Sequence, residues 1–507
     1  MRYFVEVRIS DKPLLTNKED ATVLFLEQNF DFTTQLKEVA DNLFPTLKDY
    51  MQQSHFKGAS GSTLIIPCSV NNKNHTLICI GLGKKDLNGS INIENYRRAV
   101  GLAVKTVYAK KLKSAVLEVP SAEQFGVKNI YLFEQSVIIA RMAGFRFDYY
   151  ITDPERKVDH TIIITFVVKP SLKDEAENGL KTGNIVAYSV NEARFWVDLP
   201  PSVLPPTALA DKASIIAKKY NLKITIIDET EVIALGMEGL AGVSAGSDQD
   251  CNLVIMEYKT NKTDAQTIAF VGKGITFDSG GLSLKPAVHM ETMKEDMSGA
   301  AAVIAAMEAL AQLKPDVNII AVTPLAENMP SGKATKPGDI VKFYNGKTAE
   351  VKNTDAEGRL ILADALSYVA KHYKPDAIID LATLTGACAH ALGPFFTGMM
   401  SKHEDFAKKV EAAAKTSGDR VWALPFDDDY KAGIKSDLAD MCNIGSAKYR
   451  AGAITAGFFL QNFVGDIPWV HLDIAGTAYD VPDISYYSAG ATGVGVRLLV
   501  DLAMHWK

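Results

Sequence analysis

The sequence predicts an α/β protein with a smaller first part and a larger second part, in both of which short apolar strands alternate with helices. Its 507 residues correspond to about two to four domains. Hydrophobic residues make up 47% of the chain and charged residues 22%, which is the balance of a folded globular protein. The strand-like runs of the second part are almost continuously apolar, which indicates a sheet with helices on both faces.

The first part, up to residue 168, is predicted to form one α/β domain. Its first eight residues alternate like a strand and lack the apolar core of a secretory signal. Further strands are expected over 63–67, 76–80, 114–119 and 161–168, and helices over 31–51 and 96–111. We therefore place the first domain at 1–168.

A polar, helix-like segment at 172–194 has no strand pattern, and we interpret 169–190 as a linker helix. Prolines at 200, 201, 205 and 206 then interrupt the chain before a helix resumes at 207–220. The second domain, 191–507, repeats strand-then-helix units. Its strands are expected over 223–227, 252–258, 267–271, 318–323, 377–381, 397–400 and 469–474, with helices such as 294–313 and 357–372.

Composition limits the cellular compartment and the kinds of partner that we expect for this chain. No apolar run approaches the roughly 18 residues of a membrane span. Five scattered cysteines without a CxxC pair favour a reducing cytoplasm. The net charge is −6, but residues 1–170 carry 22 Lys and Arg against 18 Asp and Glu. A solvated surface explains this weak basic excess better than a nucleic-acid partner, because no series of aromatic residues accompanies the lysines.

The most informative stretch is NTDAEGRL at 353–360, which places Asp355, Glu357 and Arg359 at the start of a predicted helix. Acidic residues in a first helical turn are often caps that the helix dipole favours. A folded chain rarely gathers this many charges beside apolar residues unless the charges bind something. This stretch is therefore a candidate site.

A second charged cluster lies upstream and follows a predicted strand. Lys273 and Asp278 belong to the glycine-rich segment VGKGITFDSGG at 271–281, and Lys285 and Asp296 come after it. Open α/β sheets bind ligands outside the carboxyl ends of their strands, so this position suits a site. Phosphate binding by the glycine-rich loop is an alternative, but the GxxxxGK[ST] and GxGxxG spacings are absent.

The residue types favour a metal-dependent hydrolase. The nine histidines include no HExxH pair, so the sequence does not predict a zincin. Carboxylates suit Mg²⁺, Mn²⁺, Zn²⁺ or Co²⁺, and four of them neutralise two dications. Paired metals roughly 3.5–4 Å apart serve several hydrolases, with Asp278 and Glu357 as candidate bridging ligands here.

The cationic residues would then have separate roles. Beside two dications a lysine is expected to have a depressed pKa and to bind metal as a neutral amine. The other lysine would remain charged and stabilise an oxyanion. Arg359 suits a bound carboxylate-like anion.

The second part resembles the leucyl aminopeptidase (cytosol aminopeptidase) family over roughly 250 residues. The resemblance rests on an ordered set of segments: VGKGITFDSGG (271–281), MKEDMSGAAAV (293–303), ENMPSGKATKPGD (327–339), NTDAEGRL (353–360), ATLTGA (382–387), KSDLADMCNIG (435–445), AGAITAGFFL (451–460) and HLDIAGTAYD (471–480). It implies an N-terminal macro-domain-like module and a larger C-terminal catalytic domain with a central mixed sheet covered by helices.

The resemblance also implies an activity and a set of ligands. The family removes N-terminal residues from peptides, with leucine and other bulky apolar residues preferred, and uses a water activated by two metal ions. One ion would be held by Lys273, Asp278, Asp296 and Glu357, and the other by Asp278, Glu357 and Asp355, the last also through its main-chain carbonyl. The ions would be Zn²⁺ or Mn²⁺, with Mg²⁺ and Co²⁺ as alternatives.

The remaining roles come from the same resemblance. Lys285 would stabilise the gem-diolate, and Arg359 would hold a bicarbonate ion that acts as general base. The side-chain pocket would be lined by Met293, Thr383, Gly386 and Ala475, and the Leu384 carbonyl would bind substrate. Family members form homohexamers, as dimers of trimers. The chain departs from the family pattern at 194–201, at Glu238 and at 244–247, none of which is a matched metal or catalytic position.

Two other functions are compatible with parts of the sequence. A two-metal phosphoesterase also uses a carboxylate cluster, but it would place more cations around the site. Some relatives are DNA-binding architectural proteins, and a degenerate member could retain only that role. Every matched metal position here keeps a competent ligand, which favours the peptidase.

Overall fold

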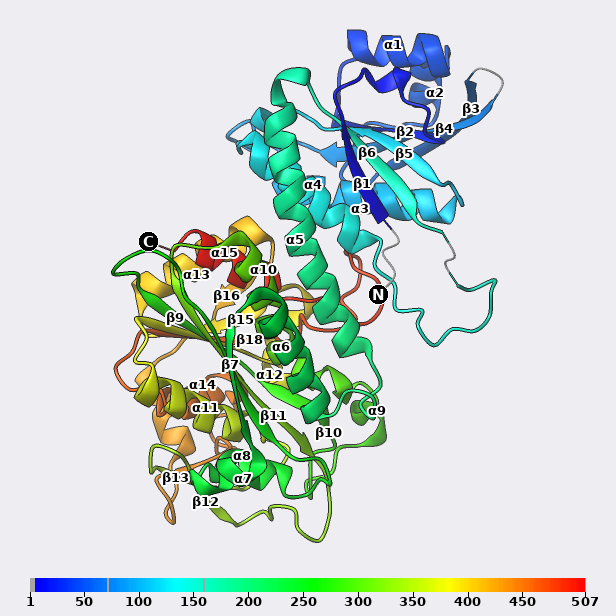
Figure 1. The fold of residues 1–507 in the computed structure, drawn as a ribbon. Coiled ribbons are helices and arrows are strands. Elements are labelled where there is room, and N and C mark those ends of the chain that lie inside the picture. Colours follow the sequence, from blue (N-terminus) through cyan, green and yellow to red (C-terminus); the bar gives the residue numbers. More distant parts are fainter. Residues whose placement is uncertain (1–4, 71–72, 158–159, 507) are drawn as a thin grey trace. The chain divides into compact units, whose positions relative to one another are not determined.

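The computed structural model describes residues 5–70, 73–157 and 160–506 (Figure 1). The chain forms two units, one comprising Met1–Tyr188 with Pro482–Ser488 and the other Ser189–Val481 with Ala489–Lys507. Each unit is an α/β structure with its own sheet, so the predicted fold class is confirmed. The domain limits drawn from the sequence at 168 and 191 stay predictions. Across the described ranges, no helix has the length and apolar character needed to cross a membrane.

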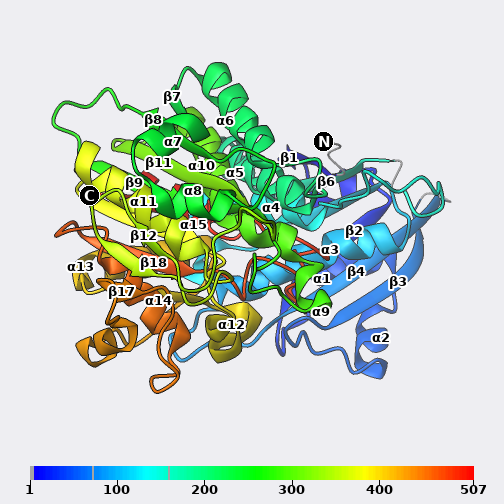
Figure 2. The ribbon, with the colours of Figure 1, turned by 90° about the horizontal axis from the view of Figure 1, so that it is seen from below.

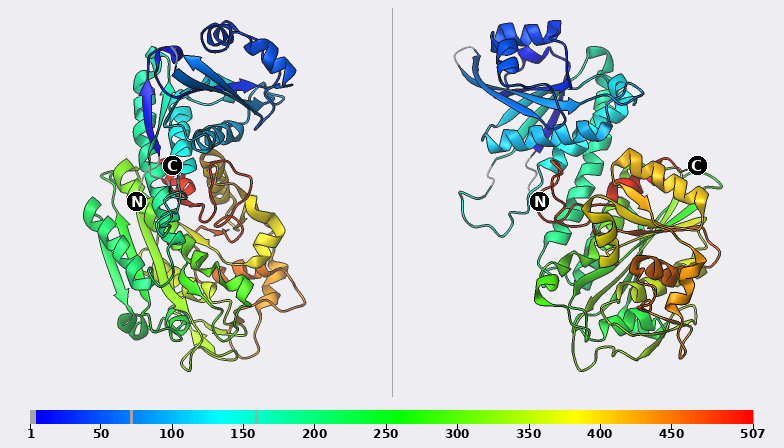
Figure 3. Two further views of the ribbon diagram at one scale, coloured as in Figure 1. Left: turned by 90° about the vertical axis from the view of Figure 1, so that its right-hand side faces the viewer. Right: turned by 180° about the vertical axis from the view of Figure 1, so that it is seen from behind.

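The first unit is a six-stranded sheet in the order β1-β6-β5-β2-β4-β3, parallel except for the β3–β4 pair. Helices α1 and α2 cover one face of this sheet, while α3 and α4 cover the other (Figures 1 and 3). The elements are β1 (Val5–Ser10), η1 (Leu14–Thr16), β2 (Ala21–Glu27), α1 (Thr34–Leu43), α2 (Leu47–Gln53), β3 (Thr63–Val70), β4 (Lys73–Gly83), α3 (Ile93–Ala109), β5 (Ser114–Glu118), η2 (Ala122–Phe125), α4 (Asn129–Ala143), β6 (Ile162–Val167) and η3 (Pro170–Leu172).

The helix predicted over 31–51 is wrong as a single element, because the chain breaks between α1 and α2. Pro45 lies in this break and has no backbone N–H to continue a helix. The residue before a proline is driven away from helical dihedrals, and Phe44 accordingly has φ −157° and ψ 87°. The predicted strand at the chain start begins at Val5 in the structure, and residues 1–4 lie outside the described part.

The second unit is built on a nine-stranded mixed sheet in the order β16-β15-β18-β14-β9-β11-β8-β7, with β10 added alongside β11. Strands β18, β14, β9, β11 and β10 are parallel to one another. The strands are β7 (Lys223–Asp228), β8 (Asn252–Tyr258), β9 (Thr267–Gly272), β10 (Gly274–Asp278), β11 (Asn318–Asn328), β14 (Ala377–Ala382), β15 (Thr397–Met400), β16 (Val421–Ala423) and β18 (Trp469–Asp473). A separate three-stranded sheet joins β12 (Ile340–Lys342), β13 (Thr348–Glu350) and β17 (Met441–Cys442).

Helices cover both faces of the nine-stranded sheet, as the apolar strands predicted (Figures 1 and 2). The group with α6, α10, α13 and α15 packs on one face, and the group with α7, α8, α11 and α14 on the other. The helices are α5 (Lys173–Asp198), within which the two units divide, α6 (Pro206–Tyr220), α7 (Glu229–Ala234), α8 (Glu238–Ser244), α9 (Ala287–Met290), η4 (Met293–Met297), α10 (Ser298–Leu313), α11 (Gly358–His372), α12 (Gly386–Leu392), η5 (Gly393–Phe395), α13 (Glu404–Ser417), η6 (Asp428–Ile434), α14 (Gly452–Gln461) and α15 (Val496–Met504).

The parallel strands end on one edge of this sheet, and their last residues carry or precede the charged side chains. Strand β10 ends at Asp278, β11 at Asn328 and β18 at Asp473. Lys273 directly follows β9, and Thr383 directly follows β14. This edge lies outside the carboxyl ends of the strands, which is where open α/β sheets bind ligands.

Candidate metal centre

The two charged clusters of the sequence meet in the second unit. Asp278 at the end of β10 lies beside Asp355 and Glu357 from the loop before α11, and one carboxylate oxygen of each lies within 4.8 Å of the others. Asp278 and Glu357 are each 2% exposed. Residues about 80 positions apart in the chain therefore share one group of negative charge.

Lys273 links Glu357 to Asp296, which lies on its other side. Its Nζ is 2.9 Å from Glu357 Oε1 and 2.7 Å from Asp296 Oδ1, and it donates a hydrogen bond to the Thr383 carbonyl at 2.8 Å. Thr383 Oγ1 also donates to Asp296 Oδ1 at 2.7 Å. The end of β14 thus fixes the Lys273–Asp296 half of the centre.

Lys285 joins the other two carboxylates. Its Nζ is 2.8 Å from Asp278 Oδ2 and 2.5 Å from Asp355 Oδ1. Asp278 Oδ1 faces the other way and accepts hydrogen bonds from the Gly280 N–H and from Asn328 Nδ2, both at 2.8 Å. The centre thus consists of two carboxylate pairs, each bridged by one ammonium group.

Helix capping does not explain these carboxylates. Glu357 is the N-cap residue of α11, yet among the described residues its side chain makes no capping hydrogen bond. Asp296 lies in η4, a 3₁₀ turn, and α10 begins only at Ser298, so the helix predicted from residue 294 starts later than expected. Both side chains turn instead toward Lys273, which favours the binding interpretation over capping.

The pKa shifts show how the charges compete. Burial, aided by the Glu357 charge, raises the pKa of Asp278 to about 6, and burial raises the pKa of Asp296 well above its usual value. Burial acts to raise the pKa of Glu357 too, but the ammonium groups of Lys273 and Lys285 outweigh it, so this pKa is lowered. Four carboxylates face two ammonium groups, and the excess negative charge favours bound cations.

The lysine shifts run opposite to the depressed pKa expected beside metal ions. Burial acts to lower the pKa of Lys273, but Asp296, Glu357 and Asp278 raise it overall. The pKa of Lys285 is also raised, because Asp278 and Glu357 outweigh its burial. Protein groups alone therefore keep both lysines charged, and a depressed pKa requires the additional positive charge of bound dications.

Arg359, in the first turn of α11, lies at the edge of the centre and is 6% exposed. One terminal NH group donates to the Asn443 carbonyl at 2.6 Å, whereas Nε has no hydrogen-bond partner within the described chain. Burial lowers the pKa of Arg359 to about 10. Its guanidinium thus keeps a free donor edge that suits an anion.

Four of the five residues predicted to bind substrate follow two neighbouring strands. Thr383 and Leu384 come after β14, Gly386 begins α12, and Ala475 comes after β18. Asp473 joins these segments, since its Oδ1 accepts hydrogen bonds at 3.2 Å from both the Leu384 and the Ala475 N–H groups. Met293 begins η4, three residues before Asp296, and is half-buried.

Sequence reasoning missed three buried polar residues that hold this region together. Asp473 is fully buried, Asn328 is 4% exposed and Asn443 is fully buried. Asn443 Oδ1 accepts from the Lys352 N–H at 2.8 Å, and its Nδ2 donates to the Asn353 carbonyl at 2.6 Å. Asp473 and Asn328 end mostly apolar strands, and a polar residue at that position was the signal that could have found them.

The donor set fits divalent cations. Asp296 Oδ2 and Glu357 Oε2 are buried oxygens for which the described residues offer no hydrogen-bond partner. A buried carboxylate oxygen without a partner is costly, and a bound cation would satisfy it. Carboxylate oxygens with one amine nitrogen match the ligands of borderline dications such as Zn²⁺ and Mn²⁺.

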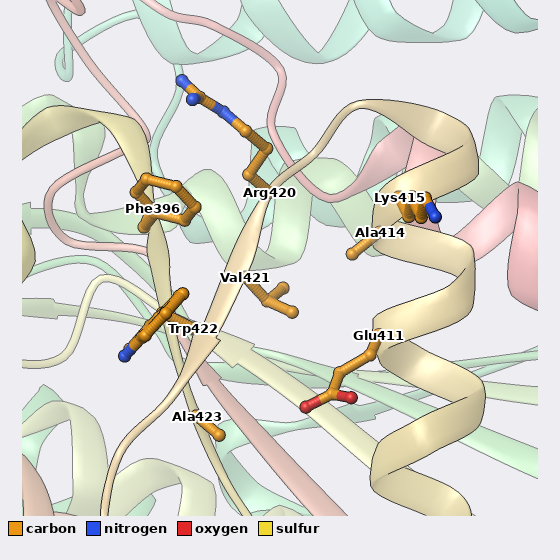
Figure 4. A pocket seen from close by; sticks show the side chains of 8 residues that line it. All are labelled: Phe396, Glu411, Ala414, Lys415, Arg420, Val421, Trp422 and Ala423. Carbon is orange, nitrogen blue, oxygen red and sulfur yellow. The ribbon is translucent and has the colours of Figure 1, made fainter. Parts of the chain in front are cut away.

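A pocket elsewhere in the second unit does not share this chemistry. It lies between α13 and β16, has a volume of about 520 Å³, and is lined by Phe396, Glu411, Ala414, Lys415, Arg420, Val421, Trp422 and Ala423 (Figure 4). Trp422 is 60% exposed there. None of the lining residues belongs to the carboxylate centre, so the pocket adds nothing to the predicted site.

The buried excess of carboxylates thus fits the class of metal-binding proteins to which the two-metal hydrolases belong. Comparison with known proteins agrees. The catalytic-domain model of the cytosol aminopeptidase family matches residues 191–500, and the N-terminal-domain model of that family matches residues 23–154. A probable cytosol aminopeptidase of Alkaliphilus oremlandii is 40% identical over 486 residues, which cover 95% of this chain and 96% of that protein. One from Aquifex aeolicus is 41% identical over 90% of each chain.

A solved structure has the same fold over nearly the whole chain. The bottromycin maturation enzyme BotP, in complex with manganese, is 30% identical, covers 96% of this chain and 99% of its own, and superposes with a TM-score of 0.83. The chain belongs to the cytosol aminopeptidase family. Membership of this family makes it a metal-dependent aminopeptidase, which is a hydrolase acting on peptides.

Proposed function

We propose that this aminopeptidase removes leucine and other bulky apolar residues from the N-termini of peptides, with two divalent ions per subunit. One observation carries the proposal: Asp278, Asp355 and Glu357 lie within 4.8 Å of one another at the carboxyl edge of the sheet. Family membership supplies the reaction class, and the excess of carboxylates over ammonium groups at this edge supports bound dications. The number of two ions comes from the resemblance to the family.

The ligands are proposed as the sequence assigned them. Lys273, Asp278, Asp296 and Glu357 hold one ion, while Asp278, Glu357 and Asp355 hold the other, with the Asp355 carbonyl as a further ligand. When bound, the two ions polarise the scissile carbonyl and acidify the attacking water. Zn²⁺ or Mn²⁺ is proposed, with Mg²⁺ and Co²⁺ as alternatives; the manganese of BotP supports Mn²⁺ in a similar protein. The free amine of the substrate would complete one coordination shell, which restricts cleavage to the N-terminus.

The cationic side chains have distinct proposed roles. Lys285 Nζ lies between Asp278 and Asp355, where a charged ammonium can stabilise the oxyanion of the gem-diolate. Arg359 is proposed to hold bicarbonate as the general base. Its unpaired Nε and its buried position support an anion there.

The substrate pocket is proposed to be lined by Met293, Thr383, Gly386 and Ala475, with the Leu384 carbonyl accepting a hydrogen bond from substrate. Contact between Thr383 and Asp296 supports this assignment, because it brings one lining residue against a proposed ligand. A methionine supplies a flexible apolar wall that suits bulky side chains.

Assembly, location and domain limits are also proposals. We propose a homohexamer, arranged as a dimer of trimers, in the cytoplasm. The name of the family and the absence of paired cysteines support this location.

We further propose that residues 191–507 form the catalytic domain and 1–168 a macro-domain-like module, joined by a linker helix at 169–190. Agreement of the catalytic family model with residues 191–500 supports that division.

The proposed reaction is tested with leucine p-nitroanilide, alanine p-nitroanilide and p-nitrophenyl phosphate, each assayed with and without added Mn²⁺ or Zn²⁺. We expect metal-dependent release of p-nitroaniline, fastest from the leucine compound. Hydrolysis of the phosphate ester alone would show a phosphoesterase instead. Equal rates on leucine and alanine would contradict the preference for bulky residues.

A further inference from the structure

We propose that Asn328 is a positioning residue that holds together the two chain segments that carry Asp278 and Asp355; this inference rests on the proposed two-metal function. Asn328 is the last residue of β11 and is 4% exposed. Its Nδ2 donates to Asp278 Oδ1 at 2.8 Å and to the Thr354 carbonyl at 3.0 Å. One amide group therefore contacts a proposed ligand on β10 and the peptide that precedes Asp355.

The orientation of this amide is fixed by its partners. A carboxylate oxygen and a carbonyl oxygen can only accept, so the NH₂ group must face both of them. The opposite orientation would bring the amide oxygen against two acceptors. A Cβ on Gly281 would lie 2.8 Å from Asn328 Oδ1, so the loop after β10 also packs against the other side of the amide. The amide group thus has one satisfactory orientation.

This arrangement determines which oxygen of Asp278 faces the centre. The Gly280 N–H and Asn328 Nδ2 both bind Oδ1, which leaves Oδ2 directed at Lys285. A carboxylate held at one oxygen cannot rotate freely, and its other oxygen is presented in a fixed direction. The contact with Thr354 fixes the neighbouring peptide, and through it the place of Asp355, which is proposed to bind with both its side chain and its carbonyl.

The main chain of Asn328 strengthens the same link. Its carbonyl accepts from the Ser279 N–H at 3.0 Å and from Ser279 Oγ at 2.6 Å. These bonds keep the residue after Asp278 against the end of β11 whatever the side chain at position 328 is. Replacing the side chain therefore tests the amide and leaves the pairing of β10 with β11 in place.

The test compares Mn²⁺ affinity of the full-length wild type, Asn328→Ala, Asn328→Leu and the control Asn252→Ala by titration calorimetry after chelator treatment. Asn252 lies on β8 of the same sheet and is 6% exposed, and within the described chain its Nδ2 donates a hydrogen bond only to the Asp250 carbonyl. We expect both Asn328 variants to bind Mn²⁺ about 10–100-fold more weakly, as is typical when a group that orients a ligand is removed. We expect Asn252→Ala to match the wild type.

Activity and stability separate positioning from a merely structural role. Excess Mn²⁺ should restore part of the lost kcat on leucine p-nitroanilide with little change in KM, and the thermal midpoint without metal should match that of Asn252→Ala. Unchanged Mn²⁺ affinity would overturn the inference. So would unfolding of both Asn328 variants in the absence of metal, because it would assign the residue a structural role. A wild type that binds no Mn²⁺, Zn²⁺ or Co²⁺ would overturn the proposed function itself.

Discussion

The surroundings of the Glu357 side chain favour metal binding over helix capping. Its carboxylate is buried and contacts Lys273, and its second oxygen has no hydrogen-bond partner among the described residues. Since a buried charge is costly without a counterion, this side chain is better explained as a ligand than as a helix cap. The same reasoning covers Asp296, whose Oδ1 contacts the Lys273 ammonium and whose Oδ2 has no hydrogen-bond partner among the described residues.

The substitution Glu357→Gln is expected to abolish turnover and leave the fold intact, because the amide removes a bridging charge while keeping the shape. The loss should exceed the roughly 10–100-fold seen when only a supporting group is removed. Leucine p-nitroanilide hydrolysis and Mn²⁺ binding measure it. The matched control is Glu308→Gln, since Glu308 is also 2% exposed but pairs with Lys219 of α6 at 3.2 Å. Retained activity in Glu357→Gln would contradict the ligand assignment.

At the scale of elements, the start of α11 is pressed against the loop after β9. Gly358, the first residue of α11, faces the Lys273 side chain, and an added Cβ would lie 2.7 Å from Lys273 Nζ. A methyl group at that distance forces the lysine to move, because real Cβ contacts are longer. An alanine at this position can therefore be accommodated only by a shift of the Lys273 side chain.

The substitution Gly358→Ala is expected to lower activity and metal affinity, although alanine favours a helix interior by about 1 kcal/mol. The reason is that displaced Lys273 can no longer serve Glu357 and Asp296 together. Kinetics on leucine p-nitroanilide and calorimetry with Mn²⁺ test this. Gly332→Ala is the control, since an added Cβ there has no neighbour within 4 Å. Equal activity of the two variants would refute the steric argument.

A second link between elements involves Asp364 of α11, which is fully buried. Its oxygens accept hydrogen bonds from the Leu240 N–H of α8 at 2.9 Å and from the Tyr344 N–H at 2.8 Å. Burial raises the pKa of Asp364 from 3.8 to about 7, against the lowering effect of these bonds. The folded state therefore binds this proton more tightly than the unfolded state does.

Because the folded pKa is the higher one, the contribution of Asp364 to the free energy of unfolding falls as the pH rises from 3.8 to about 7. The slope is at most about 1.4 kcal/mol per pH unit. The Asp364→Asn variant cannot ionise at this position, so its free energy of unfolding relative to wild type should increase as the pH rises over this range. Any pH-independent difference that the amide introduces does not affect this trend. Urea unfolding of the two metal-free proteins at several pH values measures the difference. A difference that does not vary with pH would rule out the shifted pKa.

At the scale of the whole molecule, bound cations are expected to stabilise the second unit as well as to activate it. The carboxylate excess destabilises the folded chain, and ions that bind only the folded state offset it. One ion at 100 times its Kd adds about 2.7 kcal/mol. Chelation should therefore remove activity and lower the thermal midpoint, and Mn²⁺ or Zn²⁺ should restore both. Activity that survives exhaustive chelation would contradict a metal centre.

The proposed hexamer makes a separate prediction about the intact protein. Light scattering should give a mass about six times the 55.1 kDa of one chain. A monomeric mass at micromolar concentration would exclude the hexamer without affecting the chemistry, since every residue of the centre comes from one chain. The measurement should be repeated after chelation, which shows whether assembly depends on the ions.

The sequence by itself determined the α/β class, most strands of the second unit and the charged residues of the centre. Apolar runs and helical periodicity depend on neighbours in the chain, so β9, β14 and α11 lie within one or two residues of their predicted limits. Local rules also explain the break at Pro45, although the pattern of apolar residues alone predicted a continuous helix there. The segments that resemble the cytosol aminopeptidase family then indicated the type of reaction.

Only the tertiary structure decided how the charges are shared and oriented. Lys273 and Lys285 each bridge a different pair of carboxylates. The spacing of these residues along the chain does not show which carboxylates each lysine contacts. Asn328 contacts Asp278 because β11 pairs with β10 in the sheet. Asp473 contacts Leu384 because β18 pairs with β14. Hydrogen bonds and pKa shifts depend on distance and burial in space, which only the packing of residues far apart in the sequence defines.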